Sequence, residues 1–460
     1  MPFEGRGISA ILSIVNYDVI IVGAGPAGIF AAIELSGRKG LKVLVLDAGR
    51  DITTRTRDDL FHGFGGAGAF SDGKLNLSSE VGGFLADYAG HQELSELIRY
   101  VDELYLNYGA PRELKGGDKA GVAALSEAAA MAGLRLVPFS IRHLGTDRCA
   151  GVLKNIRKDL DAKIEFCFNK EVKDVIVENG IVKGVSTTDG DAFYSDFVAL
   201  CPGRVGSGWL EDVVKTLGLS TTINPVDIGV RVEVPASILR SITDAVHEAK
   251  FMYNSKVFND PVRTFCMNPY GVVVKEKYKG FCTVNGHSFS VKKSENTNFA
   301  ILVSTTFTEP FKEPIAYGRY IASLANLLGE GIIVQRLGDL LHGRRSTREG
   351  VAKNPVKPTL LDATAGDLSF VLPYRYVSDI LEMLETMDKV APGINSPSTL
   401  LYGVEVKFYS TRLKLTGTME TEVKNLFAAG DGAGVTRGIV QASVSGVMAA
   451  KGILERMGGK

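Results

Sequence analysis

The sequence of 460 residues is poor in cysteine and tryptophan and has no long hydrophobic run. Its five cysteines include no C-x-x-C pair, which argues against a dithiol redox centre and a disulfide framework. We therefore expect a reducing, cytoplasmic location, and we expect no metal site. The apolar stretch "ISAILSIV" (residues 8–15) is too short to span a bilayer and carries no cleavage signal, so we expect no transmembrane segment and no signal peptide.

The chain also lacks a net charge, because 52 basic residues balance 52 acidic ones. Neutrality and the lack of a basic-aromatic stripe argue against a nucleic-acid partner. What the chain does have is apolar content, at 45% of its residues. This predicts two or three globular domains with sizeable cores.

A strand–turn–helix–strand unit near the N-terminus carries a dinucleotide-binding fingerprint. Residues 19–22 and 43–46 are apolar runs typical of buried parallel strands, and residues 29–35 predict a helix with small residues on one side. Between the first strand and the helix stand three glycines at G-x-G-x-x-G spacing: Gly23, Gly25 and Gly28.

Each part of this fingerprint has a physical role. Gly23 permits a tight turn, Gly25 lets a pyrophosphate approach the backbone, and Gly28 lets the helix pack on the strand. The helix N-terminus, which includes Pro26 and Ala27, offers a positive dipole end to phosphates.

Asp47 ends the second strand, 19 residues after Gly28, and we expect it to accept a hydrogen bond from a ribose hydroxyl, with Ala48 beside it. The alternative is a glycine turn in an ordinary α/β unit. A second formal match, at residues 63–68, follows a charged segment and precedes no apolar helix. It is therefore not a second Rossmann turn.

The C-terminal segment contains another strand–loop–helix unit. A strand at residues 426–429 ends in Gly430-Asp431, and a long helix begins at about Gly438. This unit resembles the second FAD motif of flavoproteins related to glutathione reductase. The resemblance implies that Asp431 holds a ribityl hydroxyl and that Ile439 and Val440 place N–H groups near flavin N1 and O2. The alternative is a buried unit with an N-cap aspartate.

Residues 171–204 predict a three-stranded meander with turns at Asn179-Gly180 and Asp189-Gly190. A plain hairpin unit is the alternative. The resemblance to FAD proteins implies that the backbone of Val172 reads adenine and that the turn at Gly203 lies beside FAD.

The whole chain resembles a family of FAD-dependent dehydrogenases among the glutathione-reductase-type flavoproteins, with more distant similarity to geranylgeranyl reductases and p-hydroxybenzoate hydroxylase. The motifs that carry the resemblance are "GGAGAFSDGKL", "RTFCMNPYGVVV", "TVNGHSFS", "NFAILVS", "QRLGDLLHGRRST", "YGVEVKFYS" and "AAGDGAG". Many bacterial members read Cys-Met-Cys-Pro-Gly-Gly where this chain has Asn268 and Tyr270. Mechanisms that need paired cysteines are therefore excluded.

This resemblance implies an α/β fold with FAD as the cofactor. We expect a discontinuous Rossmann-type domain at residues 17–218 and 400–460, and an inserted α+β substrate domain of mixed sheet and helices at residues 219–399. The glycine-rich loop after the second strand is expected to touch FAD through Gly65, Gly66, Ala67, Gly68 and Ser71.

Several side chains are candidates for chemistry beside a flavin. Cys266, His287 and Glu405 could transfer a proton, and Cys266 could also act as a nucleophile. Arg437 and Lys74 could bind an anionic substrate, although Lys74 could instead pair with Asp72. Each has a plainer alternative as a buried, packed or solvated residue. The basic run at residues 343–348 is either an anion site or a solvated surface.

The sequence thus predicts an oxidoreductase that transfers a hydride between flavin N5 and a small organic substrate. An external electron donor or acceptor is the other expected partner, and the oligomeric state is left open. The alternatives are a saturase of isoprenoid double bonds, similar to geranylgeranyl reductases, and a flavin-binding sensor without turnover. A disulfide reductase is disfavoured by the missing C-x-x-C and second fingerprint.

Overall fold

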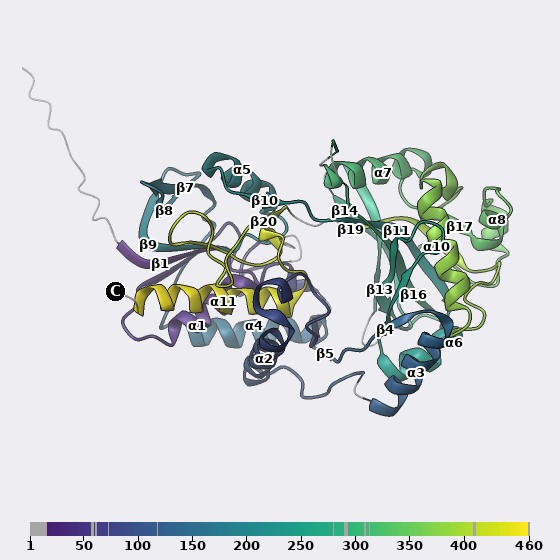
Figure 1. Ribbon diagram of the computed structural model, residues 1–460, viewed down its shortest axis with the longest axis horizontal. Helices are drawn as coiled ribbons and strands as arrows, with labels where there is room; N and C mark the ends of the chain where they lie inside the picture. The colour runs from purple at the N-terminus through teal and green to yellow at the C-terminus, as the bar shows by residue number, and fades with distance from the viewer. Residues whose placement is uncertain are drawn as a thin grey trace, which may run out of the picture.

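The computed structural model describes residues 16–458, except 57–58, 60–61, 72, 117, 279, 289–292, 308–309, 312 and 408–410. Two sheets, each with its own apolar core, lie side by side (Figure 1). We call the half built on the seven-stranded sheet the Rossmann unit and the half built on the eight-stranded sheet the cap. In the described part of the chain, no helix is both long and apolar enough to cross a bilayer.

The sheet of the Rossmann unit has the order β6-β2-β1-β9-β8-β7, and β21 also pairs with β9. Parallel pairing joins β6, β2, β1, β9 and β21, whereas β7, β8 and β9 form the antiparallel meander that the sequence predicts. The strands are β1 (Asn16–Val22), β2 (Val43–Asp47), β6 (Glu165–Phe168), β7 (Val172–Glu178), β8 (Ile181–Thr187), β9 (Ala192–Leu200) and β21 (Leu426–Ala428).

Helices at the two ends of the chain pack together in this unit (Figure 1). A β carbon on Gly446 of α11 would lie 1.9 Å from the carbonyl oxygen of Ala27 in α1, so only glycine allows this approach. The helices are α1 (Pro26–Ser36), α2 (Ala86–Asn107), α4 (Thr146–Leu160), α5 (Ser207–Leu217) and α11 (Ile439–Gly458), with the short elements η2 (Gly66–Phe70), β3 (Lys74–Asn76), β5 (Ile141–His143), β10 (Thr221–Thr222), β20 (Arg412–Leu413) and η4 (Asp431–Ala433).

The cap sheet has the order β18-β17-β19-β11-β16-β13-β12-β4. Its central strands are antiparallel. The strands are β4 (Arg135–Val137), β11 (Val226–Pro235), β12 (Lys250–Asn254), β13 (Pro261–Asn268), β16 (Asn296–Thr305), β17 (Ile333–Arg336), β18 (Thr364–Ala365) and β19 (Leu400–Lys407).

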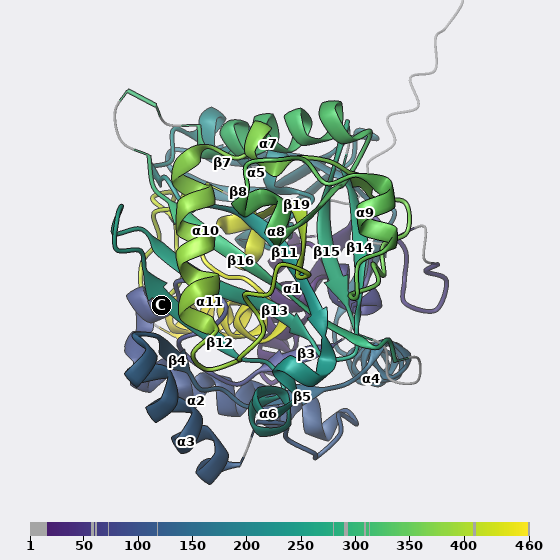
Figure 2. The ribbon, with the colours of Figure 1, turned by 90° about the vertical axis from the view of Figure 1, so that its right-hand side faces the viewer.

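Helices cover one face of the cap sheet, as the near side of Figure 2 shows. They are α3 (Lys119–Ala132), α6 (Ala236–Val246), α7 (Pro314–Gly329) and α10 (Tyr374–Met387), and the shorter α8 (Leu337–Leu341), α9 (Arg348–Ala352) and η3 (Leu368–Phe370) lie between α7 and α10 in the chain. A separate hairpin, β14 (Val272–Tyr278) and β15 (Phe281–His287), contacts β11 and β19.

Apolar and charged residues alternate along β11, so one face of the cap sheet is apolar and the other is charged. Val226, Ile228, Val230 and the following valines belong to the apolar core under the helices. The charged residues of the same strand point to the opposite face, because successive side chains in a strand alternate. These residues are Asp227, Arg231 and Glu233.

The cap takes in more of the chain than the expected range of 219–399. Strand β4 pairs with β12, and β19 pairs with β11, so residues 135–137 and 400–407 belong to the cap sheet. The sequence predicts both segments to belong to the Rossmann domain. The reason is that β19 is buried along its whole length and needs two neighbouring strands, which the cap supplies through β11 and β17.

Candidate functional site

The turn before α1 is shaped by two close glycine contacts. A β carbon on Gly23 would lie 2.2 Å from the carbonyl oxygen of Cys201, and one on Gly28 would lie 1.9 Å from the carbonyl oxygen of Gly23. A β carbon on Gly25 would instead meet only Gly66 Cα, at 4.0 Å. The backbone of Gly25 therefore borders open space, as a pyrophosphate site requires.

The N-terminus of α1 completes this cradle. The helix has no side-chain cap and no acidic residue in its first turn. The first N–H groups of a helix have no intrahelical partner, and here they belong to Ala27 and Gly28, because Pro26 has no N–H. These donors and the helix dipole suit an anion.

Asp47 ties together the loops around the cradle. Its carboxylate accepts hydrogen bonds from the backbone N–H groups of Ala24 (2.7 Å), Gly49 (2.8 Å) and Gly63 (2.7 Å). A carboxylate has about four acceptor positions, so one is left for a ribose hydroxyl. The expected contact between Asp47 and a ribose stays a prediction, and the structure adds a role that the sequence did not indicate. Ala48 follows at an exposed position.

The glycine-rich loop at residues 63–68 packs directly against the fingerprint turn. The N–H of Gly65 donates to the carbonyl oxygen of Ala24 at 2.8 Å, and a β carbon on Gly66 would lie 3.1 Å from Gly25 Cα. The Ser71 hydroxyl is used within the loop, where it donates to the carbonyl oxygen of Gly68 at 2.9 Å. Asp72, the other partner considered for Lys74, lies outside the described residues.

Arg55 holds this loop in place, and sequence reasoning missed it. Its Nη1 atom donates to the carbonyl oxygens of Gly63 (3.3 Å), Phe64 (2.7 Å) and Gly66 (3.1 Å). The sequence around Arg55 is charged and has no regular pattern. Only the nearby glycines indicate that a loop follows, which a side chain could hold in place.

The C-terminal motif lies on the other side of the cradle. A β carbon on Gly430 would lie 3.0 Å from Ala27 Cβ, and one on Gly432 would lie 2.6 Å from the carbonyl oxygen of Gly203. The three segments expected to hold FAD therefore meet at one place. Val172, whose backbone is expected to read adenine, starts β7, and the preceding Lys170 donates its N–H to the carbonyl oxygen of Asp47.

Asp431 lies at the centre of this motif with its side chain 18% exposed. It accepts a hydrogen bond from the Thr436 hydroxyl at 2.8 Å, and Arg204 Nε lies 3.7 Å away. Burial raises the pKa of Asp431 above its ordinary value, against the effect of the two nearby arginines, Arg204 and Arg437. The helix α11 starts shortly after, with Gly438 exposed, Ile439 half-buried and Val440 buried.

These observations fit FAD. The open backbone at Gly25, the uncapped N-terminus of α1 and the aspartate before α11 supply donors for a diphosphate and an acceptor for a hydroxyl-bearing chain.

Contacts across the interface bring the cap over this cradle. Lys74 Nζ lies 3.3 Å from Glu248 Oε2 and 3.4 Å from Asn268 Oδ1. At the other end of the interface, Asn224 donates to the carbonyl oxygen of Gly434 at 3.0 Å. Lys74 thus contacts the cap, a role that the sequence did not indicate. Its expected binding of an anionic substrate stays a prediction.

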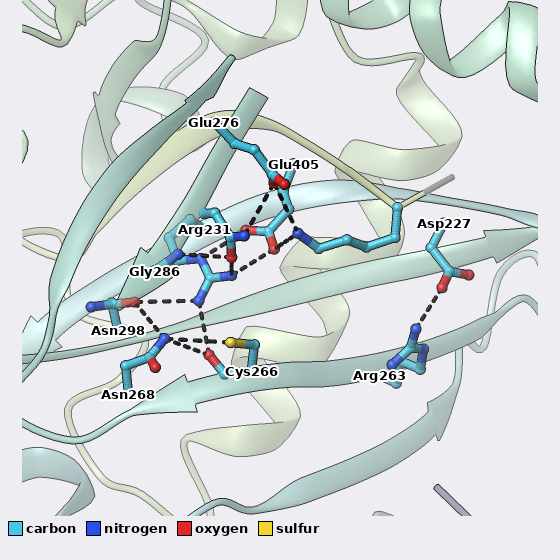
Figure 3. A network of polar contacts seen from close by, with 11 residues as sticks. Asp227, Arg231, Arg263, Cys266, Asn268, Glu276, Gly286, Asn298 and Glu405 are labelled. Carbon is cyan, nitrogen blue, oxygen red and sulfur yellow. Dashed lines mark hydrogen bonds and ion pairs between the residues drawn. The ribbon is translucent and has the colours of Figure 1, made fainter. Parts of the chain in front are cut away.

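The charged face of the cap sheet holds a buried network around Arg231 (Figure 3). Its guanidinium donates to both carboxylate oxygens of Glu405, at 2.7 and 2.5 Å. The Nη1 atom also donates to the carbonyl oxygen of Cys266 at 2.8 Å and lies 3.3 Å from Asn298 Oδ1. Glu405 further contacts Lys407 Nζ at 3.0 Å. Arg231 is a second residue that sequence reasoning missed, although the alternation of charges in "DIGVRVEV" signals a polar face.

A second ion pair lies at the end of β11 nearer the Rossmann unit. Arg263 Nη2 lies 2.5 Å from Asp227 Oδ2, and Ser304 donates to the same carboxylate. Burial by itself raises the pKa of Asp227. The charges of Arg263 and Arg437 outweigh this effect, so the pKa lies below its usual value. Arg437, a candidate for substrate binding, belongs to the Rossmann unit and therefore acts on the cap across the interface.

The three candidates for proton transfer occupy different environments. Cys266 lies in an irregular part of β13, where φ is 47° and the pairing with β16 shifts register. Glu405 is fully buried in the ion-pair network and not solvent-facing. His287 is exposed at the end of β15, at the open end of the hairpin. Only Cys266 and Glu405 are brought together, through Arg231.

The basic run at residues 343–348 lies far along the cap from these contacts. Arg344 is 63% exposed and pairs with Asp339, which also accepts a hydrogen bond from Ser346. These contacts fit a structural role for the run.

Comparisons with known proteins match a segment in each half of the chain. The family described as "FAD-dependent protein, C-terminal domain-like" matches residues 225–408, and the "NAD(P)-binding Rossmann-like domain" matches residues 21–75. An uncharacterized protein of Clostridium beijerinckii is 30% identical over 476 residues, which cover 95% of this chain and 80% of that protein.

Solved structures give weaker likenesses. L-Proline dehydrogenase from P. horikoshii has a TM-score of 0.43 at 12% identity, covering 96% of this chain and 94% of its own. Quinol fumarate reductase from E. coli has a TM-score of 0.41 at 13% identity, covering 97% and 71%. Glycine oxidase from Geobacillus kaustophilus has a TM-score of 0.36 at 15% identity, covering 96% and 95%. Scores this low carry no information on the substrate.

The alignment with the clostridial protein spans the Rossmann unit and the cap, and the cap itself matches the family of FAD-dependent proteins. This chain therefore belongs to the same family as the clostridial protein and is an FAD-dependent oxidoreductase.

Proposed function

We propose that the protein transfers a hydride between flavin N5 and a small organic substrate bound between the cap and the Rossmann unit. One observation carries this proposal. The charged face of the cap sheet, with Asp227 and Arg263, lies opposite the loops that form the cofactor cradle, and Lys74 and Asn224 join the two across the interface. When bound, FAD supplies the redox chemistry.

The residues of this chain would position both reactants. The cofactor would be held by the fingerprint turn, the glycine-rich loop, Val172, Gly203 and the C-terminal motif. In this arrangement Asp431 would accept a ribityl hydroxyl, and the N-terminus of α11 would stabilise negative charge on the reduced flavin. Cys266 would be the proton donor, because its carbonyl group is fixed by Arg231, and Asn268, two residues later, lies 3.4 Å from Lys74 of the Rossmann unit.

The charges on the cap face favour a polar substrate over an isoprenoid chain. An isoprenoid chain would need an apolar lining, whereas Arg231, Glu405 and Asp227 make this face charged and are held there in ion pairs. The saturase alternative is therefore less well supported than oxidation or reduction of a small polar molecule.

The test is an anaerobic screen of the purified protein. We expect a yellow protein that releases FAD, and not FMN, on denaturation. Its flavin absorbance should be bleached by some members of a metabolite panel and only slowly by NADPH alone. A protein that takes up no added FAD would contradict the cofactor assignment, and one that binds FAD but is reduced by no metabolite or artificial donor would favour a sensor.

A further inference from the structure

Three side chains on the charged face of the cap form a cluster beside the network around Arg231, to which Lys407 is linked through Glu405. The ring of Phe265 is half-buried and lies in β13. The guanidinium of Arg263 lies 4.7 Å from its ring centroid, and the ammonium of Lys407 lies 5.8 Å from it. We call Arg263, Phe265 and Lys407 the aromatic-cation cluster.

Lys407 is the least satisfied cation of this cluster. Its side chain is only 10% exposed. Among the described residues, one carboxylate oxygen lies within hydrogen-bond distance of Nζ, that of Glu405 at 3.0 Å, and the nearest oxygen of Glu276 lies at 3.9 Å. An ammonium has three N–H donors, so a group this deeply buried should have more acceptors than one.

The single close acceptor is also shared. Both oxygens of Glu405 already accept hydrogen bonds from Arg231, so the carboxylate faces two cations. The more distant Glu276 interacts with cations on both sides of the interface. Burial by itself raises the pKa of Glu276. The charges of Lys407 and Arg204 outweigh this effect, so the pKa lies below its usual value. Lys407 therefore shares its one close carboxylate with Arg231, and the second carboxylate lies beyond hydrogen-bond distance.

The cluster also lies on the side of the cap that meets the Rossmann unit. Lys407 pairs in register with Asp227, and the charge of Arg437 from the Rossmann unit acts on that aspartate. Glu276, which faces Lys407, is reached by the charge of Arg204, whose side chain lies 3.7 Å from Asp431. The cluster thus borders the region between Asp431 and the cap.

We propose that the aromatic-cation cluster binds the carboxylate of a planar, unsaturated or aromatic substrate. The inference deepens the proposed function and rests on it. The ammonium of Lys407 donates to the carboxylate, the guanidinium of Arg263 adds positive charge, and the ring of Phe265 packs against the planar body of the substrate.

Phosphate and carboxylate share the chemistry that would bind to these cations. The carboxylate is favoured because a carboxylate conjugated to a planar body lies in the plane of that body, which suits an ammonium 5.8 Å from a ring centroid, whereas a phosphate is tetrahedral.

The experiment uses the full-length, FAD-loaded protein and four simple probes: benzoate, benzyl alcohol, phenyl phosphate and acetate. Calorimetry gives each dissociation constant, and the flavin difference spectrum shows whether the probe lies near the cofactor. We expect benzoate to bind at least tenfold more tightly than each of the other three and to perturb the flavin spectrum.

Three variants separate the proposed role from a general effect on folding. Lys407→Gln should weaken benzoate binding at least tenfold. Glu276→Gln removes a negative charge near the ammonium and keeps an acceptor for Asn285, so it should tighten benzoate binding several-fold. Lys353→Gln changes an exposed lysine of the cap and should have no effect. FAD content and thermal midpoint check that each variant is folded.

Equal binding of benzoate and benzyl alcohol, or unchanged benzoate binding in Lys407→Gln, would overturn the proposal. So would weaker binding in Glu276→Gln. Tighter binding of phenyl phosphate would assign the site to a phosphate, and equally tight binding of acetate would remove the planar requirement. A protein whose flavin is reduced by neutral metabolites but that ignores benzoate would refute this inference and leave the proposed function intact. Failure to bind FAD would refute the proposed function itself.

Discussion

The backbone of Gly66 lies against that of Gly25, so that a β carbon on Gly66 would be 3.1 Å from Gly25 Cα. The glycine-rich loop thereby forms a wall of the cofactor cradle without being a second fingerprint. The glycines around this wall differ in what an added side chain would meet, which is either open space or a neighbouring backbone atom. This difference can be tested.

Gly25→Ala should leave the fold intact and weaken FAD binding by about tenfold or more, because its β carbon would enter the open space reserved for the diphosphate. Gly28→Ala should instead destabilise the protein by about 1–3 kcal/mol, because its β carbon would collide with the carbonyl oxygen of Gly23. FAD titration and urea unfolding of the apoprotein distinguish the two outcomes. Equal effects of both substitutions on unfolding would contradict this assignment.

Asp431→Asn should weaken FAD binding by about tenfold, because a charge-assisted hydrogen bond to the ribityl chain is lost. The same change should stabilise the apoprotein at neutral pH. Burial raises the pKa of Asp431 in the folded state, so ionisation costs stability as pH rises from the unfolded pKa through the folded one. The measurement pairs FAD retention with thermal unfolding at pH 7. Unchanged FAD content would remove Asp431 from the cofactor site.

Arg231→Met should destabilise the protein by about 3–5 kcal/mol, because it removes one partner of a fully buried ion pair. The double variant Arg231→Met/Glu405→Leu should recover part of this loss, because neither charge of the pair remains, although Lys407 loses Glu405 as its close acceptor. Urea unfolding of the two single variants and the double variant gives the coupling energy. A single variant within about 1 kcal/mol of the parent would show that the pair is not buried in solution.

Asp379 should make the stability of the cap depend on pH. Burial and the neighbouring carboxylates of Asp260 and Glu382 raise its pKa to about 6. The folded state therefore keeps this proton where the unfolded state has lost it. Stability should fall as pH rises from about 4 to 6 and stay level above that.

Asp379→Asn should remove this fall and stabilise the protein at pH 7 by about 2 kcal/mol. The exposed Glu385 on the same helix supplies the control, and Glu385→Gln should keep the fall in stability. Urea unfolding at several pH values between 4 and 8 provides the measurement. An unchanged slope in Asp379→Asn would assign the pH dependence to another group.

Local patterns in the sequence predicted the Rossmann unit well. The apolar runs at β1 and β2, the glycine spacing before α1 and the turns of the meander all depend on neighbours within a few residues. The same holds for β11 and α10 in the cap, whose periodicity is strong. Such features follow from steric and hydrophobic rules that act along the chain.

Contacts between segments far apart in the sequence could not be predicted from local patterns. Arg231 and Glu405 are 174 residues apart, and Lys74 and Asn268 are 194 residues apart. Each pair depends on the register of strands that the sequence does not specify. Strand β4 has only three residues, so neither its existence nor its place at the edge of the cap sheet is visible as a pattern.

The cap is woven from two separate passes of the chain, one through α3 and β4 and the other from β11 to β19 (Figure 1). Each pass leaves the Rossmann unit and returns to it, so four backbone segments cross between the halves. A domain joined to its neighbour by two crossing segments can rotate as a rigid body about that hinge, whereas four crossing segments restrict such a rotation of the cap. Entry of substrate should therefore depend on local movements, such as those of the β14–β15 hairpin. A deletion limited to residues 219–399 would leave β4 without its pairing partner β12.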